Sequence, residues 1–278
     1  MRGRGTDNPT VLKVAVEAAL RAGALLMASY GKLKRSDIKT KSKNDFVTKI
    51  DKRAEELIIS NIKKHFPNHG ILAEETGKTP GRQTFWVIDP LDGTSNYIHQ
   101  IPMFSISIGV IENGRLKVGV VYDPIHRELF TAQKGKGAFL NKRRIRVTAV
   151  KRLSDTLMTT GIPFRARDRF DEYMASFRTI SLESVGIRRA GSAALDLAYV
   201  ACGRFDGFWE LDLSPWDIAA GALLIQEAGG KISDMWGTGD YLKNGDVLAS
   251  NGLIHQELQK ITSHLFTPTH RDKLCLSV

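Results

Sequence analysis

The stretch Trp86–Tyr97, WVIDPLDGTSNY, decides the fold, because a short apolar run leads directly into a loop that carries two aspartates. The apolar run has the length and composition of a buried strand. Pro90 has no backbone N–H, so we expect the strand to end after Asp89. The Gly-Thr-Ser-Asn run after Asp92 is typical of a turn that opens a helix. Asp89 and Asp92 should therefore lie close together, where two ionised carboxylates need a proton, a basic side chain or a metal cation between them.

Length and composition indicate a globular α/β protein with a sizeable core. The chain has 278 residues, of which 42% are hydrophobic and 25% are charged. Its two cysteines, Cys202 and Cys275, argue for a reducing compartment and against a thiolate metal cluster. The first nine residues lack the apolar core of a signal peptide, and the apolar segment after them carries Lys13, Glu17 and Arg21 on one helical ridge. We therefore expect a cytoplasmic protein with no membrane partner.

The order of expected elements alternates helices and strands along the whole chain. Helices are expected over 9–30, from Thr48 to 66, 168–184, 192–203, 215–230 and near the C-terminus; a basic connection is expected over 32–44 and a loop over 76–84. Strands are expected over 71–73, 85–89, 105–111, 115–123, 128–133, 137–141, 157–162, 187–190, 205–211, 231–235 and 246–250. The Asn113-Gly114 pair predicts a hairpin. We expect one domain over 1–278, with candidate subdomains over about 1–150 and 151–266 and a tail over 267–278.

Three segments place acidic residues after an apolar element, and each has a purely structural alternative. Asp217 follows Ser214 by three residues, which predicts a capping box with proline at the first helical position. Asp92 could cap a helix that begins at the next residue. Glu74 could be one of a solvated acidic pair, and Asp51 could pair on the surface with a neighbouring lysine.

The combination of these segments favours metal-assisted phosphate chemistry over the structural alternatives. Ligand sets made of oxygen atoms, without a histidine or cysteine cluster, select Mg²⁺ before Zn²⁺. A helix that begins near Gly93 offers unpaired N–H groups to an anion. Two metal ions could activate water and stabilise the leaving oxygen of a phosphate ester.

These motifs resemble those of the inositol monophosphatase family. The resemblance is carried by DPLDGTSN at 89–96, by the Glu-Glu pair at 74–75 and by WDIAAG at 216–221, and it extends from the first helix to about Gly252. The stretch 188–210, RRAGSAALDLAYVACGRFDGFWE, is similar to the bacterial, extragenic-suppressor branch. The resemblance implies an α/β fold layered as α/β/α/β/α, a homodimer, dependence on Mg²⁺ and inhibition by lithium.

The resemblance also assigns roles to individual residues. The implied metal ligands are Glu74, Asp89, the Leu91 carbonyl, Asp92 and Asp217. Asp51 and Thr94 would orient and help deprotonate the attacking water, with Glu74 beside them as a catalytic residue. The implied substrate-binding residues are Asp92, Gly93, Thr94, Gly191, Ser192, Ala193, Glu210 and Asp217, with Glu210 as the acceptor for inositol hydroxyls.

The function predicted from these residues is Mg²⁺-dependent hydrolysis of inositol 1-phosphate, and of related polyol or sugar phosphates, by metal-activated water. Fructose-1,6-bisphosphatase, 3′-phosphoadenosine-5′-phosphate phosphatase and histidinol-phosphate phosphatase activities remain open, because the motifs do not specify the ester. A bisphosphatase would need a second basic phosphate clamp, which the sequence does not identify.

A binding role is the alternative from a different class. Proteins of the bacterial branch can act with RNA polymerase in antitermination complexes. The net charge of +10 and the cluster Lys142-Arg143-Arg144-Ile145-Arg146 are compatible with contact to RNA or to RNA polymerase. The same cluster is also typical of a solvated hairpin edge, because no aromatic residues are interleaved with its charges.

Overall fold

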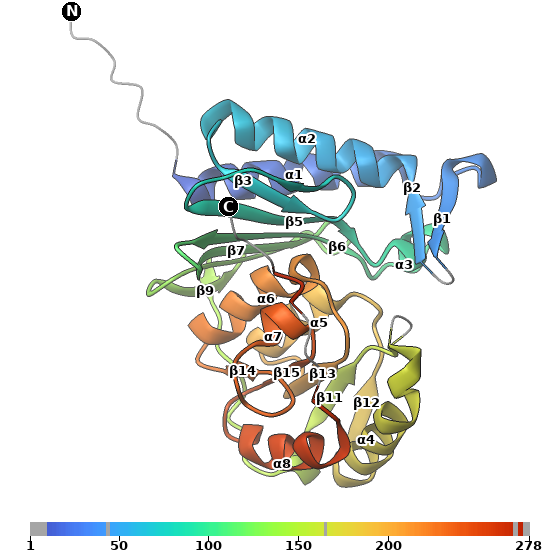
Figure 1. Ribbon diagram of the computed structural model, residues 1–278, viewed down its shortest axis with the longest axis vertical. Coiled ribbons are helices and arrows are strands. Elements are labelled where there is room, and N and C mark those ends of the chain that lie inside the picture. Colours follow the sequence, from blue (N-terminus) through green and yellow to red (C-terminus); the bar gives the residue numbers. More distant parts are fainter. Residues whose placement is uncertain (1–9, 43–44, 164–165, 269–271, 275–278) are drawn as a thin grey trace, which may run out of the picture.

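Five layers of helices and sheets make up the protein, as a computed structural model describes it for residues 10–42, 45–163, 166–268 and 272–274 (Figure 1). Helices α1 (Val11–Ser29) and α2 (Lys49–His65) cover the outer face of an eight-stranded sheet. Helices α5 (Ala193–Ala201) and α6 (Pro215–Glu227) lie between that sheet and a five-stranded one, and α4 (Phe170–Glu183) and α8 (His255–Leu265) form the last layer. The predicted α/β/α/β/α layering is confirmed.

The eight-stranded sheet has the order β10-β9-β8-β7-β6-β5-β3-β4. Its strands are β3 (Gly70–Ala73), β4 (Gly77–Thr79), β5 (Thr84–Asp92), β6 (Ser105–Glu112), β7 (Arg115–Asp123), β8 (Glu128–Gln133), β9 (Gly137–Leu140) and β10 (Arg143–Arg144). The β3–β5 pair is parallel and the other pairs are antiparallel. Asn113 and Gly114, both with positive φ, form the predicted turn between β6 and β7.

The five-stranded sheet has the order β12-β11-β13-β15-β14. Its strands are β11 (Leu157–Thr160), β12 (Gly186–Arg188), β13 (Gly207–Glu210), β14 (Lys231–Ser233) and β15 (Val247–Ser250). The remaining elements are the hairpin β1 (Ile38–Ser42) and β2 (Asp45–Thr48), the short helices α3 (Thr94–Ile98) and α7 (Tyr241–Asn244), and 3-10 turns at Arg35–Asp37, Leu153–Asp155 and Arg167–Arg169.

Strand alternation explains why each sheet is buried on both faces. In β5, Trp86 and Ile88 pack in the cluster formed with α1 and α2, whereas Val87 packs in the central cluster with α5 and α6. In β13, Phe208 joins the central cluster and Trp209 joins the cluster under α4 and α8. A buried apolar residue at every position of a strand is the pattern expected for a sheet covered by helices on both sides.

Three sequence expectations about elements were wrong. β5 does not end at Asp89 but continues through Pro90 to Asp92. The ladder with β6 shifts register between the two aspartates, so that no β6 carbonyl requires a hydrogen bond from the N–H that proline lacks. The expected basic connection over 32–44 contains β1 of the β1–β2 hairpin, apart from residues 43–44, which lie outside the described residues. The expected loop over 76–84 contains β4, which pairs with β3. The division into subdomains stays a prediction.

Candidate active site

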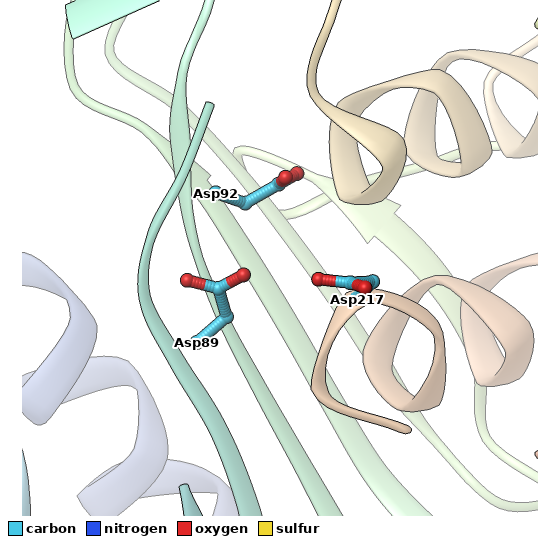
Figure 2. A group of neighbouring side chains, drawn as sticks. All are labelled: Asp89, Asp92 and Asp217. Atoms are coloured by element: carbon cyan, nitrogen blue, oxygen red, sulfur yellow. The ribbon is translucent and has the colours of Figure 1, made fainter. Parts of the chain in front are cut away.

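Three aspartates from two distant parts of the chain converge in one cleft. Carboxylate oxygens of Asp89, Asp92 and Asp217 lie within 4.8 Å of one another, and all three side chains are buried. Figure 2 shows the carboxyl groups of Asp89, from the end of β5, and Asp217, from the start of α6, facing each other, with the Asp92 carboxyl group beside them. The cleft they occupy has a volume of about 440 Å³. The predicted proximity of Asp89 and Asp92 is confirmed.

Asp92 is held by a helix 100 residues further along the chain. Its Oδ2 accepts hydrogen bonds from the Ser192 hydroxyl at 2.5 Å and from the Ala194 N–H at 2.8 Å, at the first turn of α5. The alternative that Asp92 caps the following helix is therefore wrong: Gly93 is the N-cap of α3, with φ of 95°. The carboxylate instead satisfies N–H groups that an isolated α5 would leave unpaired.

Asp89 and Asp217 are each oriented by local backbone. The Asp89 carboxylate accepts the Leu91 N–H at 2.9 Å, which tightens the turn between the two aspartates of β5. Asp217 forms the predicted capping box of α6: its Oδ2 accepts the Ser214 N–H at 2.7 Å, with Pro215 at the first helical position. The predicted capping role of Asp217 is thus confirmed, because one of its carboxylate oxygens caps α6. The same side chain also faces the cleft, so the capping role does not exclude a place in the acidic cluster.

The clustering of carboxylates shifts their protonation. Burial, and then the Asp217 carboxylate, raise the pKa of Asp92 to about 7 against the opposing effect of hydrogen bonds from Ser192 and the α5 backbone. Burial, and then Glu74, Asp92 and Asp217, raise the pKa of Asp89 well above its usual range. Carboxylates that repel one another in a buried site are stabilised by a cation. An all-oxygen set of this kind suits a hard divalent ion such as Mg²⁺.

Glu74 lines the same cleft, at the end of β3. Its backbone N–H donates to the Ile88 carbonyl at 3.2 Å, so β3 and β5 stay paired up to the site. The turn after it is fixed by Glu55 of α2, a fully buried residue that sequence reasoning missed, which accepts the Glu75 and Thr76 N–H groups at 2.9 and 2.8 Å. Glu74 itself is half-buried among the residues that line the cleft, and its neighbour Glu75 is held by α2.

Asp51 and Thr94 form a hydrogen-bonded pair. The sequence had left open that Asp51 instead pairs with a neighbouring lysine on the surface. The surface alternative is wrong: Asp51 is fully buried, because its capping box with Thr48 turns the side chain inward. The Thr94 hydroxyl lies 3.1 Å from Asp51 Oδ1 and 3.0 Å from the Leu91 carbonyl oxygen. Burial raises the pKa of Asp51 to about 6, while hydrogen bonds from Thr48 and Thr94 work against the rise.

The loop that begins with Gly93 is built for a close backbone approach. A Cβ at Gly93 would lie 2.9 Å from the Met103 carbonyl oxygen, and its φ of 95° disfavours any other residue. The Asn96 amide donates to the Met103 and Ala190 carbonyls at 2.6 and 2.8 Å, which ties this loop to the one before α5. The N–H groups at the start of α3 have no acceptor within their own helix, and Thr94 and Ser95 line the cleft there.

The far side of the cleft combines two more buried carboxyl groups with one guanidinium. Glu210, at the end of β13, and Asp196 of α5 both line the cleft, and Arg189 faces them. Burial raises the pKa of Glu210 well above its usual range; Asp196 and then Asp217 raise it further, and Arg189 lowers it. A Cβ at Gly161 would lie 2.1 Å from the Glu210 carboxyl atoms, so glycine there leaves the carboxyl group its place.

The structure brings together all twelve site residues that the family resemblance implied. Eleven of them line the cleft, among them Gly191, Ser192 and Ala193, and the twelfth, Asp51, contacts the lining residue Thr94. Sequence reasoning did not identify Asp196 or Gly161 as cleft residues. Gly161 follows two threonines, and Asp196 lies within the stretch 188–210 but was given no role there, so periodicity alone gives no signal for either residue. Only the packing of α5 against the five-stranded sheet brings them to the site.

Two other features of the sequence lie away from the cleft. Cys202 caps the C-terminus of α5 and packs partly buried against the central core, whereas Cys275 lies outside the described residues. Arg143 and Arg144 form β10, an exposed edge strand paired only with β9 among the described residues. In the part of the chain that the structure describes, we find no helix long and apolar enough to cross a membrane.

With this geometry, the comparison with known proteins gives the class of protein. The model of the inositol monophosphatase family matches residues 7–266. The chain therefore belongs to the inositol monophosphatase family, whose members are metal-dependent phosphatases.

Individual relatives carry two kinds of name. The chain is 45% identical over 252 residues to an inositol-1-monophosphatase of Mesorhizobium japonicum, and the match covers 90% of this chain and 95% of that protein. It is 47% identical over 247 residues to the Nus factor SuhB of Pseudomonas aeruginosa, covering 87% and 91% of the two chains. The crystal structure of the extragenic suppressor protein suhB from Bartonella henselae superposes with a TM-score of 0.88 at 42% identity, over 91% of this chain and 98% of that one.

Proposed function

We propose that the protein hydrolyses inositol 1-phosphate to inositol and phosphate in a Mg²⁺-dependent reaction, with related polyol phosphates as weaker substrates. The observation that carries this proposal is the convergence of carboxylate oxygens of Asp89, Asp92 and Asp217 within 4.8 Å, in a cleft whose other side holds Glu210. The Mesorhizobium relative is named for the same activity.

The residues that would hold Mg²⁺ are Glu74, Asp89, the Leu91 carbonyl, Asp92 and Asp217. They fit because their ligand atoms are all oxygens and their carboxylates repel one another without a cation. Bound Mg²⁺ would supply Lewis-acid activation of water and neutralise charge on the phosphate. Its identity as the physiological ion, and inhibition by lithium, are parts of the proposal.

The Asp51–Thr94 pair would direct the proton of the attacking water. A hydroxyl group has one proton, and Thr94 has two acceptors within reach, the Leu91 carbonyl and Asp51. If the Leu91 carbonyl were occupied as a metal ligand, the Thr94 hydroxyl would donate its hydrogen bond to Asp51 instead. The Thr94 oxygen would then accept a hydrogen bond from the attacking water. A carboxylate with a pKa near 6 is ionised at neutral pH and still basic enough to take part in general-base catalysis.

The opposite side of the cleft suits a neutral polyol better than a second phosphate. Glu210 and Asp196 offer carboxylate oxygens to hydroxyl donors. Among the described residues that line the cleft, Arg189 is the one basic side chain, and it faces the acidic pair. A bisphosphate would need more positive charge than one guanidinium already shared with two carboxyl groups.

Phosphate release from four esters tests this proposal. We expect inositol 1-phosphate to be cleaved fastest, ahead of fructose 1,6-bisphosphate, 3′-phosphoadenosine 5′-phosphate and histidinol phosphate, and only with Mg²⁺ present. Asp92→Asn should abolish release, whereas Asp171→Asn, on the exposed face of α4, should leave it unchanged. Inositol 1-phosphate as the poorest of the four substrates would refute the substrate assignment.

A second candidate function is favoured by the basic edge strand. Lys142, Arg143 and Arg144 are exposed beside β9, and relatives at 47% identity are named Nus factor. We propose that this edge contacts RNA or RNA polymerase, independently of the cleft. Changing Arg143 and Arg144 to glutamine should weaken binding and reduce its dependence on salt; unchanged binding would remove the strand from consideration.

Homodimerisation and a cytoplasmic location also belong to the proposal, and sedimentation and cell fractionation test them.

A further inference from the structure

The short connection between β13 and α6 carries functional residues at both ends. Residues 211–214 join Glu210, at the end of β13, to α6, where Asp217 is in the first turn. Leu213 lines the cleft itself. The position of this connection therefore fixes the separation between the acidic metal cluster and the substrate side of the cleft.

The backbone of this connection is strained and tightly bonded. Asp212 has a positive φ of 61°, which a non-glycine residue adopts at a cost. Its N–H donates to Asp246 at 3.1 Å, and the Leu213 N–H donates to the Gly245 carbonyl at 2.8 Å. Such a conformation persists only when surrounding contacts hold it.

One of those contacts comes from the C-terminal tail. The ammonium of Lys273 donates to the carbonyl oxygens of Asp212 and Leu213 at 2.7 and 3.0 Å and forms an ion pair with the Asp212 carboxylate. An ammonium group has three donors, so it can serve these three acceptors at once. The Lys273 backbone N–H also donates to the Lys243 carbonyl at 2.7 Å, and Figure 1 shows the last described residues, in dark red, beside α7.

The start of the tail is bound to the same network. The Thr267 hydroxyl donates to Glu172 at 2.8 Å, and Arg169 donates to the Thr267 carbonyl at 3.3 Å. Arg169 also forms a buried ion pair with Asp246, the residue that accepts the Asp212 N–H. The match to the family model ends at residue 266, so Lys273 lies beyond it.

We propose that Lys273 is a positioning residue for this site: its ammonium holds the connection over residues 211–214 in its strained conformation, and thereby sets the distance between Glu210 and Asp217. The roles of these two residues rest on the proposed function. Removal of the ammonium should let the connection relax, which weakens the metal cluster and the contact with substrate while the rest of the fold stays intact.

The test compares Lys273→Met with Lys243→Met in the full-length chain. Methionine keeps the length of the apolar stem and removes the charge and the donors. Lys243 is a matched control, because its side chain is about half exposed and pairs only with Asp240 among the described residues. In Lys273→Met we expect amide hydrogen exchange in a peptide covering 211–214 to become about tenfold faster. We also expect about threefold weaker Mn²⁺ binding, followed by electron paramagnetic resonance. Exchange of the α6 amides should not change.

Three outcomes decide the matter. Unchanged exchange over 211–214 with unchanged Mn²⁺ affinity would overturn the proposal, as would equal effects of both substitutions. A lower Tm with faster exchange throughout the protein would also overturn it, since Lys273 would then be an ordinary stabilising contact. Lys273→Arg, which restores the charge, should recover Mn²⁺ affinity at least in part. If no inositol phosphate were hydrolysed, the proposed function would fail, but exchange and Mn²⁺ binding would still decide the role of Lys273.

Discussion

Replacement of Asp51 by asparagine should reduce activity and raise stability at the same time. Asparagine keeps the shape of the side chain, and its amide oxygen can still accept a hydrogen bond, but it cannot take up a proton, so the Thr94 hydroxyl, 3.1 Å from Asp51, loses its base. An asparagine N–H turned toward Thr94 would also occupy the oxygen that should accept a hydrogen bond from water. General-base contributions are worth about 10²-fold or more, so we expect kcat to fall by at least ~10².

The expected gain in stability follows from the pKa. Burial raises the pKa of Asp51 from 3.8 to about 6 in the folded protein. At ~1.36 kcal/mol per pKa unit, the ionised group lowers the free energy of unfolding by about 3 kcal/mol relative to its protonated form. The pKa of Asp51 is higher in the folded protein than in the unfolded one. The stabilisation that protonation of Asp51 gives is therefore fully present below pH ~4 and is lost as the pH rises through ~6. The asparagine side chain of the variant would not titrate, although it also gives up part of the Thr48 cap.

Two measurements in parallel check this reasoning. Urea unfolding with EDTA, at several pH values, should show wild type and Asp51→Asn equal at pH ~4 and the variant more stable above pH ~6. Steady-state kinetics with inositol 1-phosphate should show the loss of kcat. Asp171→Asn is the control, because Asp171 is exposed on α4 and is not one of the residues that line the cleft. A kcat within about threefold of wild type would refute the role of Asp51.

The remaining predictions concern the metal cluster and the substrate side of the cleft. Mg²⁺ at about a hundredfold excess over its Kd should stabilise the protein by about 2.7 kcal/mol and raise its Tm, since the ion binds the folded state. Asp89→Asn should remove most of this shift in a thermal scan, and an equal shift in the variant would exclude Asp89 as a ligand. Gly161→Ala should displace the Glu210 carboxyl group, from which its Cβ would be 2.1 Å, and raise KM about tenfold. Gly186→Ala is the matched control, because its Cβ would meet nothing closer than 3.6 Å; equal KM values would contradict the argument. Li⁺ should inhibit phosphate release in competition for oxygen ligands, and a flat lithium titration would count against this.

The sequence by itself determined the features that depend on neighbouring residues. Ser214, Pro215 and Asp217 form a capping box because their spacing alone brings the carboxylate to the first turn of α6. Asn113-Gly114 forms its hairpin for the same local reason. The apolar run before Asp89 forms a buried strand, so the two aspartates of β5 meet as predicted. These local signals, with the family motifs, were enough for the layered fold and the acidic cluster.

Only the tertiary structure decided which distant groups complete the site. Asp92 caps α5 across 100 residues of chain, and Asp51 turns inward toward Thr94 although its neighbours in sequence are charged. Asp196 reaches the cleft because α5 packs between two sheets, and Lys273 reaches the β13–α6 connection from a tail that carries no motif. Spacing along the chain fixes a cap or a turn because few torsions intervene. Contacts between remote segments depend instead on how all the layers pack, which no local pattern encodes.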